Sequence, residues 1–411
     1  MMPGIGRGSL GRQAGFEFGV RDPHMFGNNH YIGRLLKTTL PSLPGDFLRT
    51  QLVGRFKAIP PTVLILNVSY KCDSKCVMCN SWKLPYHDDL TTDEYRAAFQ
   101  NDLFRSVEYV GITGGEPTLR KDMVELTRIM ADNMPRLRKM TLNTNGFVKE
   151  RVVPTLDEII DVANEKGFIF GTRVSLDGVG DAHEDIRRVW NAFDRAMGTV
   201  RAMQELQKKK FFNFGVSFTF TAQNLDEGQR IYDLCKKENL NVVFAIARYS
   251  ELAFGNSDLA ESVDLKEEDY PKLVDFFRKR VRESTIADGD ALLYQAYVKM
   301  FQNGMKRAMP CPSMDQGLLL NPNGELTYCE NSRAIGNVRE GDPKDFYYNP
   351  ENLAMRQEVL DKVCSSCASP CFVNAAAMKQ VFPYLKFAME LGSEKLAARF
   401  NGNGANGSSS Q

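Results

Sequence analysis

The sequence predicts an α/β fold, because segments with helical periodicity alternate with short strand-like segments between positions 62 and 250. Repeated units of this kind form a parallel sheet with right-handed crossovers. Six units, in place of the eight of a closed TIM barrel, predict a partial (β/α)6 TIM-like barrel that is open along one side. The expected strands are Val63–Val68, Val107–Thr113, Lys139–Asn145, Phe168–Asp177, Phe212–Thr221 and Asn241–Arg248.

The helices between these strands are predicted from their termini and apolar stripes. Thr91 and Glu94 have the spacing of a capping box at the start of a helix. Gly167 follows an apolar stripe from Leu156 to Ala163 and is expected to end that helix. Cys235 lies in another expected helix, where a buried thiol is the default.

Polar residues alternate with apolar ones along several expected strands, although buried parallel strands are usually apolar throughout. In the strand from 212 to 221, phenylalanine and valine take one face and polar residues take the other. A packed barrel interior does not accommodate such a face. We therefore expect a wide lumen that holds a polar ligand. A half-exposed antiparallel sheet is the alternative, which the intervening helices disfavour. The expected lumen residues are Asn143, Arg173, Asp177, Ser217 and Thr219.

Length and charge bound the class of protein. The 411 residues suggest two or three domains, and a net charge of +1 gives no indication of nucleic acid as a partner. The start of the chain has no apolar signal core, and no run reaches the length of a membrane span. Nine cysteines, mostly in two groups, are then expected to bind metal in a reducing, cytoplasmic environment.

The first cysteine group is Cys72, Cys76 and Cys79, in a C-x-x-x-C-x-x-C array directly after the first strand. Three thiolates on one loop can converge on a soft metal centre. A structural zinc site takes four ligands, and His87 is the only nearby candidate for a fourth. A 4Fe–4S cluster on three cysteines leaves one iron open to a small molecule. A zinc knuckle and an incidental buried cluster are the alternatives.

This array, followed by Gly114-Gly115-Glu116-Pro117 after the second strand, resembles the signature of the radical SAM enzymes. In that family S-adenosylmethionine chelates the open iron, and reductive cleavage of the cofactor yields a 5′-deoxyadenosyl radical that abstracts hydrogen from the substrate. The resemblance implies an external electron donor of the flavodoxin or ferredoxin type.

The resemblance also assigns cofactor contacts. Met78 fills the bulky position before the last cysteine, and the GGEP element receives the methionyl amino group. Asn145 and Ser175 lie in two further family elements, with Ser175 expected at the ribose. Arg187 or Arg188 is a candidate partner for the cofactor carboxylate. His183 lies nearby, and we expect it to be a surface-loop histidine.

The second cysteine group lies in the C-terminal part of the chain. Asn321–Gly324 predicts a turn between two short strands, and the flanking cysteines together with a distant C-x-x-C make an economical four-ligand site. The pattern resembles the SPASM and twitch extensions of radical SAM enzymes, which hold auxiliary 4Fe–4S clusters. Five cysteines, against seven in a full SPASM extension, imply one auxiliary cluster, and a zinc site is the competing interpretation. The expected ligands are Cys311, Cys329, Cys364 and Cys367, with Cys371 replacing one of the last pair or remaining free.

These observations divide the chain into five segments. We expect an N-terminal arm and capping segment (1–60), the partial barrel (61–255), a helical bridge (256–310), a SPASM/twitch-like auxiliary cluster domain (311–382), and a C-terminal helix with a disordered tail (383–411). The basic stretch Tyr31–Lys57 is expected to close the bottom of the barrel. A membrane-surface contact is the alternative for that stretch.

The substrate hypothesis rests on the lumen residues. We expect a net oxidation of a small polar metabolite, such as a sugar or cyclitol, with the auxiliary cluster accepting an electron. Arg173 and Asp177 are the catalytic candidates, and Asn143, Ser217 and Thr219 the substrate contacts. The N-terminal segment is short for a leader-binding module, so a peptide- or protein-modifying maturase is the alternative. A non-catalytic scaffold stabilised by zinc or an iron–sulfur cluster is the alternative of another class.

Overall fold

The computed structural model describes residues 58–284, 289–308, 311, 316–367, 386, 389–390 and 392–393. The chain divides into two compact units, Met1–Asp46 and Phe47–Gln411, and the fold described below belongs to the second. The stretch expected to contact the barrel bottom or a membrane, Tyr31–Lys57, lies outside the described residues. So do Cys371 and most of the expected C-terminal helix.

A parallel sheet forms the centre of the fold, as the β/α alternation predicts. Six strands follow one another in space in chain order, and each expected strand is found, with its ends at or within two residues of the expected ones. The partial (β/α)6 barrel is thus confirmed. The strands are β1 (Val63–Asn67), β2 (Tyr109–Thr113), β3 (Lys139–Thr144), β4 (Ile169–Ser175), β5 (Asn213–Phe220) and β6 (Val242–Ile246).

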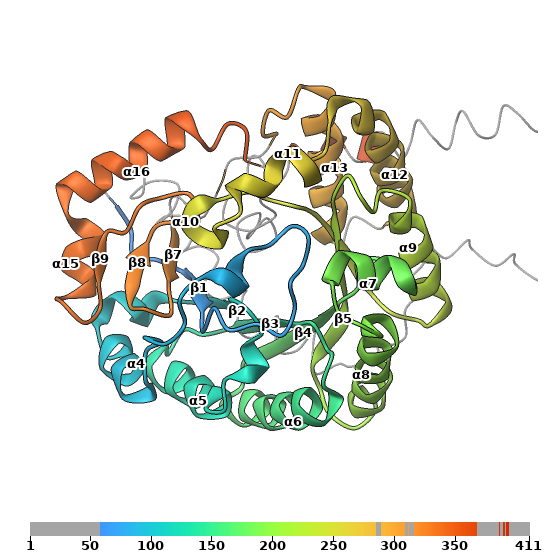
Figure 1. Ribbon diagram of the computed structural model, residues 1–411. Helices are drawn as coiled ribbons and strands as arrows, with labels where there is room; N and C mark the ends of the chain where they lie inside the picture. The colour runs from blue at the N-terminus through green and yellow to red at the C-terminus, as the bar shows by residue number, and fades with distance from the viewer. Residues whose placement is uncertain are drawn as a thin grey trace, which may run out of the picture. The chain divides into compact units, whose positions relative to one another are not determined.

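Helices cover the outer side of this curved sheet (Figure 1). They are α4 (Thr92–Phe99), α5 (Met123–Asn133), α6 (Lys149–Lys166), α8 (Ala192–Gln207) and α9 (Glu227–Lys237), with the short α7 (Asp181–Arg187) between β4 and α8. The capping box at the start of α4 is confirmed, since the Glu94 amide donates to Thr91 Oγ1 at 3.3 Å. Gly167 ends α6 at φ 85°, in the left-handed conformation that glycine adopts without strain.

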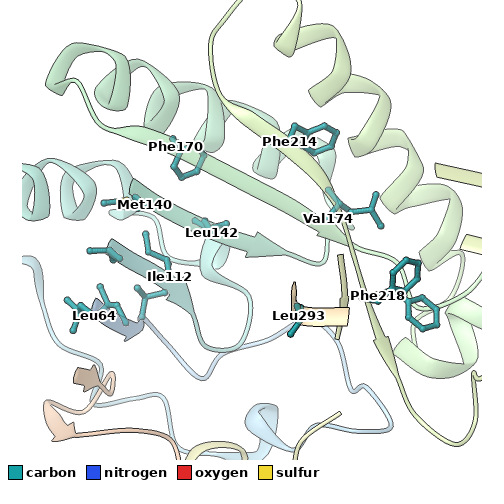
Figure 2. Close-up of a cluster of buried hydrophobic side chains, with 14 of the residues drawn as sticks. Leu64, Ile112, Met140, Leu142, Phe170, Val174, Phe214, Phe218 and Leu293 are labelled. Carbon is teal, nitrogen blue, oxygen red and sulfur yellow. The ribbon is translucent and has the colours of Figure 1, made fainter. Parts of the chain in front are cut away.

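The core lies between the sheet and these helices, and Figure 2 shows part of it. Met140, Leu142, Phe170, Val174 and Phe218 are all buried on the helix-facing side. Burial of one such side chain stabilises the fold by roughly 1.5–3 kcal/mol. The strand residues between them face the opposite, inner side. The alternation in the sequence therefore separates a packed outer face from a polar inner face.

The helical bridge covers the β6 end of the sheet. It contains α11 (Ala260–Val263), α12 (Tyr270–Glu283) and α13 (Gly289–Gln302), with single 3-10 turns at Ser257–Leu259 and Glu267–Asp269, and the short α10 (Glu251–Phe254) lies just before it. Rings of β5, β6, α12 and α13 pack together, as in the edge-to-face contact of Phe244 with Phe276 at 4.9 Å. None of the helices in the described ranges is long and apolar enough to cross a membrane.

The C-terminal region continues the sheet instead of forming a separate layer. β7 (Gly317–Leu320) pairs in parallel with β1, and β8 (Glu325–Thr327) and β9 (Gly336–Asn337) follow in antiparallel order. The expected turn is present: Gly324 has φ 90°, and its amide donates to Asn321 O at 3.0 Å. α15 (Pro343–Tyr348) and α16 (Pro350–Lys362) complete this region.

Side-chain contacts also hold the C-terminal region against the barrel, and two of them illustrate a buried and an exposed kind. The Tyr347 hydroxyl donates to Ile59 O at 3.1 Å, just before β1. Arg339 forms ion pairs with Asp88 at 2.8 Å and with Glu94 at 2.7 Å. Because the second contact is largely exposed, each of its ion pairs contributes at most about 1 kcal/mol. The shared sheet and the buried hydrogen bonds, which also include Asn67 Nδ2 to Asn321 Oδ1 at 2.9 Å, therefore contribute more to this attachment than the exposed ion pairs.

Candidate functional site

The three cysteines lie on the loop that leaves β1, and backbone hydrogen bonds hold this loop from both sides. On one side, Val68 N donates to Thr113 O at the end of β2, at 3.0 Å. On the other, Val77 N donates to Ile186 O in α7, at 2.9 Å. The cysteine loop therefore spans the carboxyl ends of the strands, which is where parallel α/β sheets bind ligands.

Gly114 and Gly115 are needed because the cysteine loop passes directly against them. Gly115 N donates to Ser69 O at 2.7 Å. A Cβ atom at Gly115 would lie 2.2 Å from Lys71 O, and one at Gly114, where φ is 124°, would lie 2.3 Å from Ser69 O. The residue type at both positions is thus fixed by contact between two loops. Their binding of the methionyl group remains a prediction.

Replacing Gly115 by alanine is expected to displace the cysteine loop, because two backbone oxygens occupy the space of the new methyl group. We expect a loss of unfolding free energy of about 1–3 kcal/mol, as for other overpacked sites, and less iron bound per chain. Gly198→Ala in α8 is the matched control, since nothing lies within 4 Å of its Cβ position. Urea unfolding and iron analysis measure both effects. Equal iron content in the two variants would contradict this account.

Glu116 joins the ends of β2 and β3 from a buried position. Its carboxylate accepts hydrogen bonds from Thr118 Oγ1 at 2.6 Å, Thr144 Oγ1 at 2.9 Å and Asn145 N at 2.8 Å. Burial raises the pKa of Glu116, and the bonds from Thr118 and Asn145 oppose that shift. The Glu116 side chain is therefore committed to the protein, and Pro117 behind it begins a 3-10 turn, Pro117–Leu119.

Asn145 ties the third strand to the cysteine loop through the residue after Cys72. Its side-chain amide donates to the carboxylate of Asp73. Arg151, in the first turn of α6, pairs with the other oxygen of the same carboxylate at 2.7 Å. The expected cofactor residue Asn145 is thus placed at the site, and one of its contacts is structural.

The three thiols lie near one another and are partly buried. Cys76 Sγ lies 3.0 Å from Ser74 Oγ, and Cys79 Sγ donates to Ser81 Oγ at 3.2 Å. Burial raises the pKa of Cys72 to about 12; a hydrogen bond from the Ser74 backbone opposes this shift, and the Cys76 thiol adds to it. Over the described ranges, no three Cys, His, Asp or Glu side chains already stand in a metal-ion geometry.

Met78 and His87, the other sequence candidates near the thiols, take different positions. Met78 packs beside the small apolar group of Val77, Ile186 and Val263. Its carbonyl accepts a hydrogen bond from Asn256 Nδ2 at 2.8 Å, which fixes the backbone before Cys79. His87 is exposed and its ring lies 4.3 Å from that of Tyr86. Among the described residues, neither His87 nor any other histidine joins the thiols in a group that could hold a metal ion.

Arg187 links the cysteine loop to a buried carboxylate. Its Nη1 lies 3.6 Å from Cys76 Sγ, and its Nη2 lies 2.6 Å from Asp177 Oδ2. Burial lowers the pKa of Arg187, but the charges of Asp177 and of the neighbouring thiols outweigh this and raise it, so the guanidinium stays charged. Of the two arginines expected at the cofactor carboxylate, Arg187 is at the site, whereas Arg188 is exposed with φ 53°.

Asp177 does not line the lumen, which corrects its expected place among the substrate-facing residues. It is fully buried beyond the end of β4, and its Oδ1 accepts from Thr219 N at 2.8 Å. Its ion pair with Arg187 makes it a positioning residue for that arginine, because an unpaired buried carboxylate would be costly. The polar alternation of the sequence stops at Ser175, where the strand ends.

His183 is fully buried, so the expectation of a surface-loop histidine was wrong. Its Nδ1 accepts from Asp177 N at 3.0 Å, and the rings of Phe147 and Phe193 lie edge-on to it. Burial and the nearby Arg187 charge lower the pKa of His183 to about 3, so the ring stays neutral at physiological pH. Cys235, by contrast, is buried as expected.

The inner face of the sheet carries the remaining candidates. Asn143 and Arg173 are register partners on β3 and β4, and Asn143 is exposed to solvent. Ser175 and Ser217 are partners on β4 and β5, with their hydroxyls 3.3 Å apart. Thr219 lies on the same partly exposed face of β5. These five side chains therefore share one face of the sheet. All except Ser175 are among the five residues expected in the lumen, and the fifth of those, Asp177, is not on this face.

The structure brings close together the four cysteines of the second group that the sequence predicts as ligands. The thiol of Cys364 is hydrogen-bonded to Cys311, and this bond, burial and the thiols of Cys311, Cys329 and Cys367 raise its pKa. Burial raises the pKa of Cys329 to about 12, with Cys311 and Cys367 adding to the shift. All four thiols thus lie within electrostatic reach of one another. Cys371 lies outside the described residues.

The second cysteine group is attached to the open edge of the barrel. Glu330, next to Cys329, forms an ion pair with Arg248, just beyond β6. Its carbonyl also accepts from Ser250 Oγ at 2.6 Å. Arg307 Nη1 donates to Cys367 O at 2.9 Å, which draws the C-x-x-C loop against the end of the helical bridge. The two groups of thiols therefore belong to one continuous structure.

The residues present fit the iron–sulfur cofactors that these arrangements imply. The first group offers three thiolate donors, and the second offers four, which matches an open and a closed four-iron centre. Arg187 Nε is buried and has no hydrogen-bond partner. A buried donor beside Cys76 suits an anionic group at this position, such as a cluster or a carboxylate.

Comparison with known proteins agrees with this geometry. Residues 66–235 match the radical SAM superfamily. The relatives include Fe-coproporphyrin III synthase of Methanosarcina barkeri, 27% identical over 54% of this chain and 52% of the relative. Pre-heme d1 synthase of Dinoroseobacter shibae is 25% identical over 58% of this chain and 53% of the relative. This chain thus spans about half the length of both relatives. AdoMet-dependent heme synthase of M. barkeri is 23% identical over 79% of this chain and 96% of the relative.

Solved structures share the fold at lower identity. SuiB of Streptococcus suis, bound to its precursor peptide SuiA, has a TM-score of 0.56 at 16% identity, covering 80% of this chain and 76% of SuiB. anSMEcpe, with bound AdoMet and the Cp18Cys peptide, has a TM-score of 0.53 at 16% identity, covering 82% of this chain and 98% of anSMEcpe. Residues 66–235 of this chain thus match the radical SAM domain, and the fold that the chain shares with SuiB and anSMEcpe extends beyond those residues. The radical SAM match implies a 4Fe–4S cluster and S-adenosylmethionine as the cofactors of this domain.

Proposed function

We propose that this protein is a radical SAM enzyme that abstracts hydrogen from a substrate bound on the inner face of the sheet. The observation that carries the proposal is the three-thiol loop, held across the carboxyl ends of β1, β2 and β3 by Gly115 and Asp73. Cys72, Cys76 and Cys79 would hold the catalytic cluster. When bound, this cluster would pass the electron that cleaves S-adenosylmethionine to the 5′-deoxyadenosyl radical. An external donor of the flavodoxin or ferredoxin type would first reduce the cluster.

The chain's own residues position the reaction. Arg187, fixed by Asp177, places a permanent positive charge at Cys76. Gly114 and Gly115 let the cysteine loop pass directly against the end of β2, and Ser175 lies on the inner face at the end of β4. The substrate must then bring its reacting C–H bond to this end of the sheet, because hydrogen abstraction depends on close and aligned approach.

The four-thiol group would hold one auxiliary 4Fe–4S cluster on Cys311, Cys329, Cys364 and Cys367. Its attachment beside β6, through Arg248 and Glu330, supports a role next to the substrate and not at a distant surface. A cluster at this place can accept an electron from a substrate radical, which would make the net reaction an oxidation. The chemistry of four thiolates also suits zinc, so metal analysis decides between the two.

We propose a small molecule with several polar groups as the substrate. The polar inner face, with Asn143, Arg173, Ser217 and Thr219, supports hydrogen bonding to such a molecule. The named relatives shift the chemical class, since two are haem synthases and one is a coproporphyrin synthase. A sugar or cyclitol therefore loses support relative to a larger metabolite with ionised groups.

A peptide is the second candidate, because two structures of the same fold contain one. SuiB is bound to the precursor peptide SuiA, and anSMEcpe to the Cp18Cys peptide. The open side of the barrel and the exposure of Asn143 are compatible with an extended chain entering the inner face. The peptide-modifying alternative fits these structures at least as well as the small-molecule one fits the sequence relatives.

The experiment that separates the candidates follows deuterium from substrate to cofactor. The reduced enzyme is incubated with S-adenosylmethionine and an extract of cells grown in deuterated medium, which is then fractionated by size. We expect deuterium in 5′-deoxyadenosine only with fractions of small, polar molecules. Activity confined to a peptide fraction would overturn the small-molecule proposal, and absence of 5′-deoxyadenosine altogether would overturn the radical SAM function.

A further inference from the structure

Two cationic side chains, Lys139 and Arg173, share the polar inner face, and only Arg173 is among the residues that the sequence predicts there. Lys139 is the first residue of β3, where its register partners are Tyr109 and Ile169. Arg173 lies on β4 beside Asn143. Met140, Phe170 and their neighbours take the opposite, helix-facing side, so the pleat directs both cations to the inner side.

Neither cation is neutralised by an ion pair within the described part of the chain. Arg173 and Lys139 are close enough to repel each other electrostatically, and the one carboxylate that acts on Lys139 is Asp290, at the start of α13. Burial and the Arg173 charge lower the pKa of Lys139 to about 8, and Asp290 opposes this shift. The positive charges of Lys139 and Arg173 therefore have, among the described residues, only the Asp290 carboxylate to offset them, in a partly desolvated place. This excess positive charge is unfavourable until an anion binds.

The surrounding groups suit an anionic ligand. Thr141 and Arg173 are partly exposed and Asn143 is exposed, so solvent reaches this face. The Tyr109 hydroxyl lies 2.7 Å from Thr141 Oγ1, which places two hydroxyls between β2 and β3 on the same face. An arginine fork with hydroxyl and amide donors is the arrangement that proteins use for carboxylate and phosphate groups.

We propose that Lys139 and Arg173 bind an oxyanion group of the substrate, a carboxylate or a phosphate. This inference rests on the proposed function, since it takes the inner face as the substrate site. At a rise of roughly 3.3 Å per residue, Lys139 lies some 20 Å along β3 from Asn145, whereas Arg173, the register partner of Asn143, lies only about 7 Å from the level of Asn145. An anionic group held between these two levels leaves the other end of the substrate near the cysteine loop. Specificity is then for elongated substrates with one acidic end.

Calorimetric titration of the full-length protein with glutarate and with inorganic phosphate, at fixed ionic strength, tests the proposal. We expect saturable binding to the wild type, and at least about tenfold weaker binding to Arg173→Gln and to Lys139→Met, because each removes a charged hydrogen-bonding group. The matched controls are Arg201→Gln and Lys209→Met, which change exposed residues of the outer helical layer. Binding of glutarate alone indicates a carboxylate, and binding of phosphate alone a phosphate.

The pH dependence provides a second readout. Glutarate remains doubly charged above neutrality, whereas Lys139 loses its proton above about pH 8. The groups near Lys139 are Tyr109 from β2, Arg173 from β4 and Asp290 from α13. Tyr294 from α13 lies near Asp290 and Arg173, and burial raises its pKa. Glutarate binding to the wild type is therefore expected to weaken between pH 7 and 9.5, and the Lys139→Met variant to lose most of this dependence.

The outcomes separate this inference from the function on which it rests. Absence of anion binding by the wild type, or unchanged binding by both variants, would overturn the oxyanion site even if the wild type cleaves S-adenosylmethionine. Conversely, wild-type protein that binds glutarate at Arg173 but forms no 5′-deoxyadenosine would overturn the proposed function and leave the site in place. Circular dichroism of Arg173→Gln and Lys139→Met verifies that each variant is folded.

Discussion

Replacing Cys72, Cys76 and Cys79 together by alanine is expected to abolish reductive cleavage of S-adenosylmethionine. The physical reason is that each of these thiolates would bind one iron of the 4Fe–4S cluster, which leaves the fourth iron open to the cofactor. Formation of 5′-deoxyadenosine by the reduced protein, measured by chromatography, should fall to the background of free reductant. Cys235→Ala is the matched control, because it removes a buried thiol that lies in α9, away from both cysteine groups.

The outcome also bears on the rival interpretation, in which the loop holds zinc and only stabilises a binding scaffold. In that case the wild type itself would form no 5′-deoxyadenosine, and the triple variant would differ from it in stability alone. Undiminished 5′-deoxyadenosine formation by the triple variant would show that cofactor cleavage does not depend on this loop.

Replacing Cys364 and Cys367 by alanine is expected to separate cofactor cleavage from product formation. The two thiols belong to the four-thiol group, which is attached beside β6 through Glu330 and Arg248. Their loss should remove about four irons per chain. Cleavage of S-adenosylmethionine should persist in part, while substrate conversion is lost because the electron from the substrate radical has no acceptor.

A double replacement of two nearby serines, Ser365→Ala and Ser366→Ala, is the matched control in the same loop, since it leaves all four thiols in place. Iron content and product yield are measured for both variants under anaerobic conditions. Normal product formation by the variant that lacks Cys364 and Cys367 would mean that the auxiliary site is only structural.

Much of the barrel follows from local sequence. Strands and helices between residues 62 and 250 differ in periodicity, and that difference survives folding because each strand packs one face on a helix. The strand ends were less certain: Asp177 continues the alternation of β4 in sequence but lies beyond the last strand residue, Ser175. Alternation alone does not show where a strand ends, so Asp177 was expected on the inner face and is instead paired with Arg187.

Contacts between residues far apart in the chain could not be predicted from the sequence pattern. β7 pairs with β1 although some 250 residues separate them, and no local pattern indicates a partner at such a distance. The burial of His183 depends on Phe147 and Phe193, which come from two other elements. Lys139 was overlooked because a lysine at the start of a strand usually reaches solvent. Its inward direction is visible from the alternation with Met140, which could have identified it.

That the cysteines of each group lie close together could, in contrast, be predicted from their spacing, while their role as ligands stays a prediction. Three thiols within eight residues on a loop after a strand, and four that meet from a hairpin and a C-x-x-C, both appear in the structure where the sequence placed them. What the spacing did not show is how the first loop is held. The loop is fixed by three contacts with other parts of the barrel: Gly115 bonds to its start, Asn145 to its Asp73, and Ile186 to its Val77.

Metal analysis of the anaerobically purified protein tests the central claim most directly. The account predicts about eight irons and matching sulfide per chain, four in the three-thiol site and four in the four-thiol site. It further predicts that addition of S-adenosylmethionine changes the electron paramagnetic resonance spectrum of the reduced wild type, because the cofactor binds the open iron. One or two zinc ions per chain with no iron, and no spectral response to the cofactor, would contradict it.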